Sequence, residues 1–266
     1  MGCVMADFIR YTIEDKVAVL VIDHPPVNAL NPQTLKELST AIDELTANPA
    51  VKVLVITGGG QLAFIAGADL GVIGGIVKTR NESAGKELIE LGQGVFNKIE
   101  HSNKPVIAAV NGACLGGGLE LAMACHIRIC GDRARLGQPE INLGIIPGWG
   151  GTQRLARIVG PAKATELILT GDQITAQQAM QLRLVNMVVP GGEVMRQAKG
   201  LAAKIANKGA LAVAAAMTAI RAGLDAELPA GLEAERRQFD IVMASDDARE
   251  GITAFLEKRE AKFQDK

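Results

Sequence analysis

Three continuous apolar runs, separated by helical segments, constrain the fold of this chain more than any other feature. The runs VKVLVITG, KPVIAAVNG and HIRICGD occupy residues 51–58, 104–112 and 126–132. Their length and their content of β-branched residues are typical of buried strands. Strands that are apolar throughout and alternate with helices indicate a mostly parallel sheet covered on both faces. The sequence therefore predicts an α/β fold.

The residues before the first of these runs predict a hairpin followed by a helix. Two short β-branched runs, FIRYTI and KVAVLVID, flank Glu14 and Asp15, which is the pattern of a β-hairpin. Residues 31–48 place Asn31 where a helix cap is expected and Pro32 at the first helical position. Leucine and isoleucine follow at helical spacing, so one face of this helix is expected to be buried.

The chain changes character after about residue 170. Upstream of that point, the Gly-rich stretch between the first two runs shows little periodicity, and we expect a mobile segment followed by a helix over 82–100. Downstream, successive helical patterns are interrupted only by the strand-like VNMVVP. We predict two regions, an α/β core over residues 1–200 and a helical C-terminal region over 201–266.

Charge and cysteine content exclude several classes of protein. The 28 basic and 29 acidic residues give a net charge of −1, which argues against a surface for nucleic acid or another polyanion. No run of 18 apolar residues suggests a membrane span, and no secretion signal is expected. The cysteines show no metal-ligand spacing with the histidines and are expected to be reduced, inert thiols of a cytoplasmic protein; they are Cys3, Cys114, Cys125 and Cys130.

The glycine-rich stretches do not support a nucleotide-binding site. GGGQLA, residues 58–63, formally fits the dinucleotide-binding pattern. It leads into no helix, however, and no acidic residue follows at a strand end about 20 positions on. The sequence also contains no phosphate-binding GxxxxGK[ST] pattern and no GxSxG nucleophile turn.

The segment ACLGGGLELAMAC, residues 113–125, combines adjacent glycines with a carboxylate in an apolar run. A helix that begins at these glycines would direct unpaired backbone N–H groups and the positive end of its dipole outward. Glycines there would also let a ligand oxygen approach, which is the geometry of an anion or oxyanion site. The alternative is that the glycines only permit tight packing between a strand and a helix.

Two glutamates in apolar surroundings are candidates for acid–base chemistry. Glu120 follows the glycines by about one helical turn, and Glu140 lies in the segment LGQPEINLGIIPGWGGTQRL. Two carboxylates whose environments differ can act as a general acid and a general base. For Glu120 the alternative is a buried salt bridge with Arg128.

Together these motifs resemble the enoyl-CoA hydratase branch of the crotonase family, and the resemblance covers nearly the whole chain. It is carried by AFIAGADL, by AAVNGACLGGGLELAMACHIRI, by ARLGQPEINLGIIPGWGGTQRLARIVG, by TGDQITAQQAMQLRLVNMVVP and by DDAREGITAFLEKREAKF. The resemblance implies an α/β, crotonase-like fold, with a spiral core of ββα units followed by a C-terminal α-helical trimerisation region.

The resemblance also implies a hydro-lyase that hydrates trans-2-enoyl-CoA thioesters to 3-hydroxyacyl-CoA, as in fatty-acid β-oxidation. Backbone N–H groups of Ala68 and Gly117 would hold the thioester oxygen. Glu120 and Glu140 would hold one water, with Glu120 helping to take its proton and Glu140 delivering a proton to the α-carbon. Gly148 would help line the pocket. Because the substrate itself carries coenzyme A, no separate cofactor and no metal is implied.

For the coenzyme A moiety, the resemblance implies that the backbone around Ala66, Asp69 and Leu70 borders the adenine. It also implies that Phe255 and Lys258 reach the phosphate or adenine of a coenzyme A bound to a neighbouring subunit. The chain is accordingly expected to form a homo-hexamer built as a dimer of trimers, with no nucleic-acid or membrane partner.

The sequence departs from the family pattern at three places. Gly71 and Val72 stand where relatives often have a Lys-Glu pair, and HPPVNAL lacks a basic residue that some relatives use to contact coenzyme A. Trp149 replaces a small residue seen in some relatives, and it either narrows the acyl pocket or packs the loop.

Other reactions of the same family remain as alternatives. An enoyl-CoA δ-isomerase usually keeps one equivalent glutamate, and other crotonase-fold enzymes of acyl-CoA use different groups. A non-catalytic homologue that binds acyl-CoA or RNA is a further alternative, but the first long helix offers only Lys36. The presence of both Glu120 and Glu140 favours hydration.

Overall fold

The three apolar runs form neighbouring parallel strands at the centre of a seven-stranded sheet: β4 (Val53–Gly58), β6 (Val106–Val110) and β8 (Ile127–Gly131). The computed structural model describes residues 3–224 and 226–266. The strand order is β1-β2-β3-β4-β6-β8-β11, and the remaining strands are β1 (Cys3–Met5), β2 (Ile9–Glu14), β3 (Val17–Ile22) and β11 (Met187–Val189). The predicted hairpin is the antiparallel pair β2–β3; from β3 to β11 all pairs are parallel.

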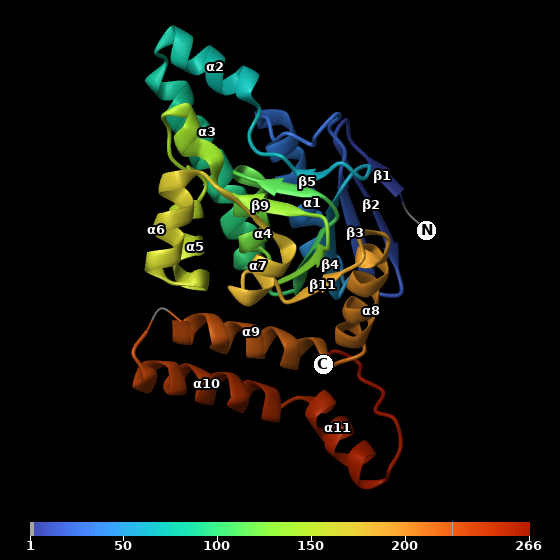
Figure 1. Cartoon of the computed structure of the whole chain (residues 1–266). Coiled ribbons are helices and arrows are strands. Elements are labelled where there is room, and N and C mark those ends of the chain that lie inside the picture. Colours follow the sequence, from blue (N-terminus) through green and yellow to red (C-terminus); the bar gives the residue numbers. More distant parts are fainter. Residues whose placement is uncertain (1–2, 225) are drawn as a thin grey trace.

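A second sheet of four short strands lies beside the first. Its order is β10-β9-β7-β5, with β5 at Ala63–Ile65, β7 at Ala113–Leu115, β9 at Arg135–Gly137 and β10 at Gln173–Thr175. The strands β5, β7 and β9 each come directly after a strand of the large sheet and are followed by helical segments. The chain thus repeats a ββα unit, which generates the spiral core that was predicted from the resemblance (Figure 1).

Helices cover both faces of the large sheet, as predicted. On one face, Ala198 and Ala202 of α8 belong to a core with Val53, Val55 and Ile107. The larger core on the other face includes residues of α1, α3 and α4. The helices are α1 (Pro32–Ala47), α2 (Leu70–Thr79), α3 (Glu82–Glu100), α4 (Gly117–Ala124), α5 (Gly151–Val159), α6 (Pro161–Thr170), α7 (Ala176–Gln181), α8 (Val194–Ala206), α9 (Ala210–Leu224), α10 (Leu228–Met243) and α11 (Asp246–Leu256), with 3₁₀ turns η1 (Pro139–Leu143) and η2 (Gly191–Glu193).

The helix predicted over 31–48 is α1, and its cap is the predicted one, because the Asn31 side chain accepts a hydrogen bond from the backbone N–H of Thr34. The helix predicted over 82–100 is α3, with the same bounds. Both predictions rest on local signals, a capping side chain and apolar residues at helical spacing, which act within one element.

The Gly-rich segment that was expected to be mobile contains a helix, α2, and its mobility stays a prediction. Asp69 caps it, because its side chain accepts hydrogen bonds from the N–H groups of Gly71 and Val72. No residue of α2 is buried, and Figure 1 shows α2 projecting at the end of the molecule away from α9 and α10. Three of its ten residues, Gly71, Gly74 and Gly75, disfavour a helix, which is why the sequence pattern predicted none here.

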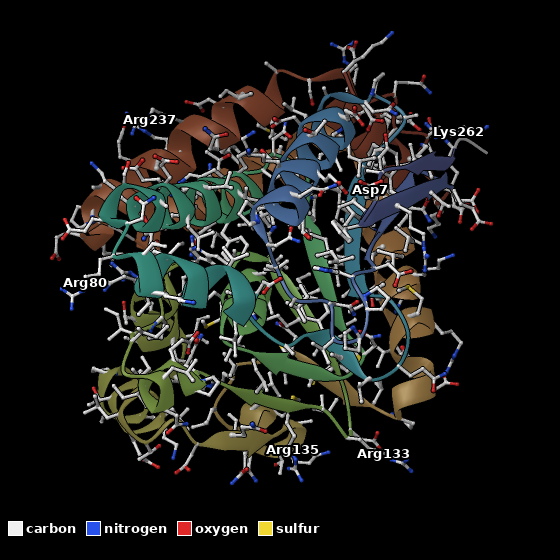
Figure 2. All side chains as sticks on the ribbon, turned by 90° about the horizontal axis from the view of Figure 1, so that it is seen from above. Asp7, Arg80, Arg133, Arg135, Arg237 and Lys262 are labelled. Atoms are coloured by element: carbon white, nitrogen blue, oxygen red, sulfur yellow. The ribbon has the colours of Figure 1, made fainter. Side chains whose placement is uncertain are left out.

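The C-terminal helices lie beneath the core in Figure 1, with α9 and α10 side by side and α11 beyond them. The predicted boundary at residue 200 falls inside α8, whose buried residues pack on the sheet; the division of the chain at that residue stays a prediction. None of the helices in the described ranges is both long and apolar enough to span a membrane. Basic side chains such as Arg80, Arg135 and Arg237 project from separate parts of the periphery (Figure 2).

Candidate active site

Glu120 is buried in the first turn of α4, where the chain leaves the short strand β7. It is 1% exposed. Its Oε1 accepts hydrogen bonds from the backbone N–H groups of Trp149, at 2.8 Å, and Gly151, at 2.7 Å. Gly151 is the first residue of α5, so the carboxylate also lies at the positive end of that helix dipole. The turn before α5 therefore supplies the partners that a buried carboxylate requires.

Arg128, the alternative partner for Glu120, is occupied elsewhere. Its Nε donates to the Leu184 carbonyl oxygen at 2.8 Å, and its Nη1 donates to the Cys125 carbonyl oxygen at 2.5 Å. The hypothesis of a salt bridge between Glu120 and Arg128 is therefore wrong. Arg128 instead joins β8 to the end of α4 through backbone carbonyl groups.

Glu140 lies beside the start of α4, in the 3₁₀ turn η1, and is partly buried. In the amide orientation that satisfies both of its polar atoms, the Gln138 side chain donates to both carboxylate oxygens of Glu140, at 3.1 Å each. A Cβ added to Gly116 would come within 2.6 Å of Glu140 Oε1, so the carboxylate fills the space that this glycine leaves. Because Gly116 precedes Glu120 by one turn, the structure brings the two glutamates to the same end of α4.

Burial dominates the electrostatics of both glutamates. Burial, aided by the charge of Glu140, raises the pKa of Glu120 to about 7 against the lowering effect of the two N–H groups and of Arg154. Burial also raises the pKa of Glu140. A carboxyl group with a pKa near neutrality can accept and release protons at physiological pH, which suits general acid–base chemistry.

Two backbone N–H groups near the start of α4 lie close to each other. The bonds from Leu30 N to the Gly67 carbonyl and from Asp69 N to the Leu30 carbonyl bracket Ala68, whose own N–H has no acceptor among the described residues. Gly117 is the first residue of α4, and its N–H likewise has none there. A Cβ on Gly117 would lie 3.5 Å from Ala68 N, so the two donors are neighbours. Two adjacent donors without a protein acceptor are able to bind one oxygen atom together.

Trp149 closes one side of this space. A Cβ on Gly117 would come within 2.5 Å of Trp149 Cζ3, and a Cβ on Gly92 would overlap the other end of the indole. The ring donates from Nε1 to the Leu88 carbonyl oxygen at 3.1 Å and meets the ring of Phe96 edge-on at 5.7 Å. Of the two alternatives for Trp149, the structure shows that it packs the loop against α3. Its contact with Gly117 also makes it a wall of the site.

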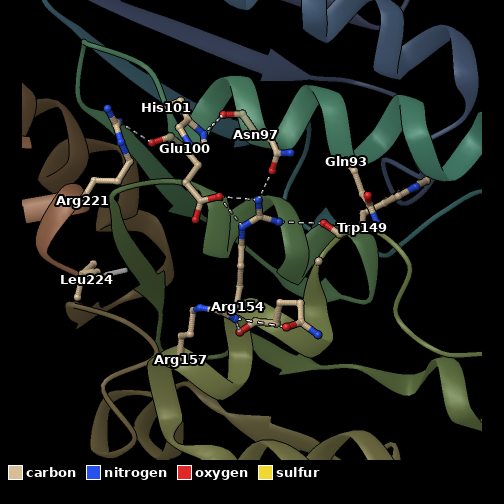
Figure 3. Close-up of a pocket in the computed structure, with 11 residues that line it drawn as sticks. Gln93, Asn97, Glu100, His101, Trp149, Arg154, Arg157, Arg221 and Leu224 are labelled. Carbon is tan, nitrogen blue, oxygen red and sulfur yellow. Dashed lines mark hydrogen bonds and ion pairs between the residues drawn. The ribbon is translucent and has the colours of Figure 1, made fainter. Parts of the chain in front are cut away.

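Trp149 also lines a cavity of about 370 Å³ between α3, α5 and the end of α9 (Figure 3). Its lining includes the polar or charged side chains of Gln93, Asn97, Glu100, Arg154, Arg157 and Arg221. Neither Glu120 nor Glu140 lines it. Trp149 therefore contacts Gly117 at the start of α4 and also borders this cavity.

The predicted residues near Ala68 occupy one connected segment. Ala66 donates from its backbone to the Val27 carbonyl, Asp69 caps α2, and Leu70 is 59% exposed. Gly148 lies in the turn next to Trp149, and its carbonyl accepts from the Gln93 side chain at 2.8 Å.

Phe255 and Lys258 are not brought to the site within one chain. Phe255 lies on α11, and it is 82% exposed; Lys258 comes just after that helix. Figure 1 places α11 beyond α9 and α10, at the end of the molecule opposite α2. Their predicted role requires a second subunit and stays a prediction.

The thiols whose side chains the structure describes offer no reactive group. Cys114, Cys125 and Cys130 are buried and unpaired, and burial raises the pKa of both Cys125 and Cys130 to about 12. Such thiols are unreactive. The side chain of Cys3 lies outside the described residues. Among the described residues, no group of three or more His, Cys, Asp or Glu side chains could hold a metal ion.

Sequence reasoning missed three residues that support the site: Gln138, Gly92 and Arg154. Gln138 leaves no signal, because a buried amide beside a glutamate is visible only in three dimensions. Gly92 does leave a signal in the sequence. A glycine within a helix lowers the stability of the helix and suggests that another group approaches it closely. Arg154 leaves a second signal in the sequence. It lies in the first turn of α5, where the positive end of the helix dipole disfavours a cation.

The ββα spiral with its helical C-terminal region defines the crotonase fold. Residues 12–266 match the family model for enoyl-CoA hydratase/isomerase, and the chain belongs to this family. It is 45% identical to a crotonyl-CoA hydratase of Syntrophomonas wolfei, over 94% of this chain and 95% of that protein. It is 44% identical to a short-chain-enoyl-CoA hydratase of Clostridium acetobutylicum, over 92% and 93%.

Among solved structures, the enoyl-CoA hydratase from Bacillus anthracis superposes with a TM-score of 0.94 at 37% identity, over 98% of this chain and 100% of that one. The predicted fold and family are thereby confirmed. The names of these relatives agree with the predicted class of enzyme, a hydro-lyase.

Proposed function

We propose that the protein adds water to the double bond of trans-2-enoyl-CoA thioesters and so forms 3-hydroxyacyl-CoA. The observation that carries this proposal is the placement of Glu120 and Glu140 at the end of α4 that also presents the Gly117 N–H beside that of Ala68. The family and the names of the relatives support it.

In the proposed mechanism, the N–H groups of Ala68 and Gly117 donate to the thioester oxygen. They withdraw electrons from the conjugated double bond, which makes the β-carbon electrophilic, and they stabilise the enolate; each such donor contributes about 3 kcal/mol. Their positions are fixed by the bonds that bracket Ala68 and by the start of α4, so little reorganisation is needed during the reaction.

The two glutamates transfer the protons during the addition of water. Glu120 accepts a proton from the water as the water oxygen bonds to the β-carbon, and Glu140 donates a proton to the α-carbon, which converts the enolate to the product. After one turnover, Glu120 is protonated and Glu140 is ionised. Proton exchange with solvent then restores the ionised Glu120 and the protonated Glu140. The two N–H groups that donate to Glu120 hold its carboxylate in one orientation throughout.

Hydration of crotonyl-CoA, followed as the loss of absorbance of the conjugated thioester, tests the proposal. The δ-isomerase alternative is tested in parallel with a 3-enoyl-CoA. Efficient isomerisation without hydration would reject the hydratase proposal. A role in fatty-acid β-oxidation and a location in the cytoplasm rest on the family resemblance alone and stay predictions.

We further propose that the substrate carries a short acyl group, because Trp149 stands against Gly117, next to the donor that would hold the thioester. Carbons beyond the β-carbon would meet the indole before they could reach the cavity that Trp149 borders. The printed names of two relatives, a crotonyl-CoA hydratase and a short-chain-enoyl-CoA hydratase, agree with this size.

Replacing Trp149 with Ala is expected to open the site into that cavity. The ratio of kcat/KM for an eight-carbon enoyl-CoA to that for crotonyl-CoA should rise by about tenfold or more, since each accommodated methylene contributes about 1 kcal/mol or more. Trp149→Phe, which keeps an aromatic ring but loses the bond to the Leu88 carbonyl, should give a smaller rise. Thermal unfolding of both variants is measured alongside, and an unchanged ratio in folded protein would contradict the proposal.

For the assembly, we propose the trimers and hexamer implied by the resemblance. Large apolar side chains are exposed along α9, α10 and α11; they include Leu224, Leu228, Leu232, Phe239, Ile252 and Phe255. An exposed apolar surface of this kind favours association. Neighbouring copies of the chain would cover it, and such contacts would bring Phe255 and Lys258 to the coenzyme A of another subunit.

Lys258→Ala is therefore expected to raise KM for crotonyl-CoA by about three- to tenfold, as expected for the loss of one charge-assisted hydrogen bond, with kcat little changed. Lys262→Ala, a change at an exposed lysine four residues on, is the matched control and should leave KM unchanged. Sedimentation of both variants should give the mass of the wild-type assembly. Equal KM values for the two variants would contradict the role of Lys258.

A further inference from the structure

Arg154 contacts the turn that donates hydrogen bonds to Glu120. Its guanidinium group lies on the side of that turn that faces away from Glu120. Its Nη1 donates to the Trp149 carbonyl oxygen at 2.9 Å, while the N–H of the same residue donates to Glu120 Oε1. Trp149 is thus fixed at both ends of its backbone, by a guanidinium on one side and by the glutamate on the other.

The rest of the guanidinium is anchored to α3. Its Nη2 donates to Glu100 Oε2 at 2.6 Å and to Asn97 Oδ1 at 2.8 Å, and its Nε donates to the same glutamate at 3.1 Å. The Arg154 side chain is 11% exposed. A planar fork that contacts three groups in three directions has little freedom to move. Figure 3 shows this network along one wall of the cavity.

The backbone of the turn is shaped to accept this side chain. Gly150 has φ of +109°, a conformation that L-residues with side chains rarely adopt. A Cβ at this position would also overlap Arg154 Nη1. The guanidinium therefore occupies the space that the glycine leaves, close to the first turn of α5.

That position is electrostatically unfavourable for a cation, because the N-terminus of a helix carries partial positive charge. Pairing with Glu100 offsets the cost but does not require the contact with Trp149. The contact with the Trp149 carbonyl is thus a specific feature of the arrangement. Its effect is to fix the peptide groups that direct two N–H donors at Glu120.

We propose that Arg154, anchored by Glu100 and Asn97, is a positioning residue for hydration: it holds the Trp149–Gly151 turn so that Glu120 is kept in its catalytic orientation. This inference rests on the proposed function. Arg154 touches neither the substrate nor the reacting atoms; it acts through the backbone of Trp149. Among the described residues, the charged groups whose fields reach Glu120 are Glu140 on η1 and Arg154 on α5.

The test compares Arg154→Met with Arg157→Met. Arg157 is exposed and lies on the same helix, and its guanidinium bonds only to Gln153 within the described chain, so it is the matched control. Arg154→Met is expected to lower kcat for crotonyl-CoA by about ten- to a hundredfold, the effect of a small displacement of a catalytic group, with KM changed little. Arg157→Met should match the wild type in both constants.

A pH profile separates positioning from a general loss of stability. Arg154 lowers the pKa of Glu120, so its removal should move the acid limb of kcat/KM to higher pH. Arg154→Lys keeps the positive charge but loses the planar guanidinium group. We therefore expect the acid limb of its kcat/KM profile to stay near the wild-type pH, while kcat stays reduced. Millimolar guanidinium, which can reach the site through the cavity, should partly restore kcat to Arg154→Ala.

A titration of the Glu120 carboxyl carbon by NMR, in protein without substrate, gives a readout that does not depend on activity. If the wild type hydrates no enoyl-CoA, the proposed function fails, while a shifted Glu120 titration in Arg154→Met still supports the positioning role. If Arg154→Met does not fold, Glu100→Gln replaces it in the same comparisons. Unchanged kcat and an unchanged Glu120 titration in a folded variant would overturn the inference.

Discussion

Glu120→Gln is expected to lower kcat for the hydration of crotonyl-CoA by about 10²- to 10⁴-fold, the usual contribution of a general base. A glutamine can still accept hydrogen bonds from the N–H groups of Trp149 and Gly151, so the turn before α5 should keep its conformation. It cannot take a proton from water, and the loss should therefore appear in kcat more than in KM. The measurement is the absorbance assay at several pH values.

The same variant should be more stable than the wild type, which distinguishes a lost base from a lost fold. The pKa of Glu120 is raised to about 7 by burial, and in the unfolded chain it is near the ordinary value of a glutamate. Glu120 therefore lowers the stability of the wild type as pH rises from the unfolded pKa to the folded one. The full cost, about 3 kcal/mol, is present above pH 7.

Thermal unfolding at two pH values checks this sign. At pH 8 the Tm of Glu120→Gln should exceed that of the wild type, and below pH 4 the two values should converge. Glu166→Gln, which removes an exposed carboxylate paired with Lys163, is the control and should change neither kcat nor Tm appreciably. Full activity of Glu120→Gln would remove it from the mechanism.

The larger elements of the fold could be predicted from the sequence because their signals are local. The strands β4, β6 and β8 are apolar throughout, and α1 has its cap and its apolar face within one segment. The four strands of the second sheet have only three residues each, too few for any periodicity, and so the spiral came only from the family resemblance.

The candidate site divides in the same way. Glu120 and the glycines before it could be identified because a carboxylate and several glycines are unfavourable within an apolar helix. That Glu140 lies beside Gly116 could not be predicted, because it depends on how η1 packs against α4. The donors to Glu120 are backbone N–H groups, which every non-proline residue carries and which therefore leave no trace in the sequence.

Glu140→Gln is the second substitution with a large expected effect. It should lower kcat for hydration by about 10²- to 10⁴-fold, because no group would then deliver a proton to the α-carbon. Its pH profile should differ from that of the wild type in one respect. The charge of Glu140 raises the pKa of Glu120, so its removal should lower that pKa and move the acid limb of the residual activity to lower pH. Arg154→Met should move the limb in the opposite direction.

Exchange of the α-hydrogen of a saturated substrate assigns the two glutamates individually. In deuterated water, the α-hydrogen of butyryl-CoA can exchange with solvent without any addition of water. This exchange requires only the two oxyanion donors and the carboxylate that faces the α-carbon. Glu140→Gln should abolish this exchange, while Glu120→Gln should retain it. The reverse pattern would exchange the two roles. Loss of exchange in both variants would mean that the carboxylates act only as a coupled pair, since the proton of one then depends on the charge of the other.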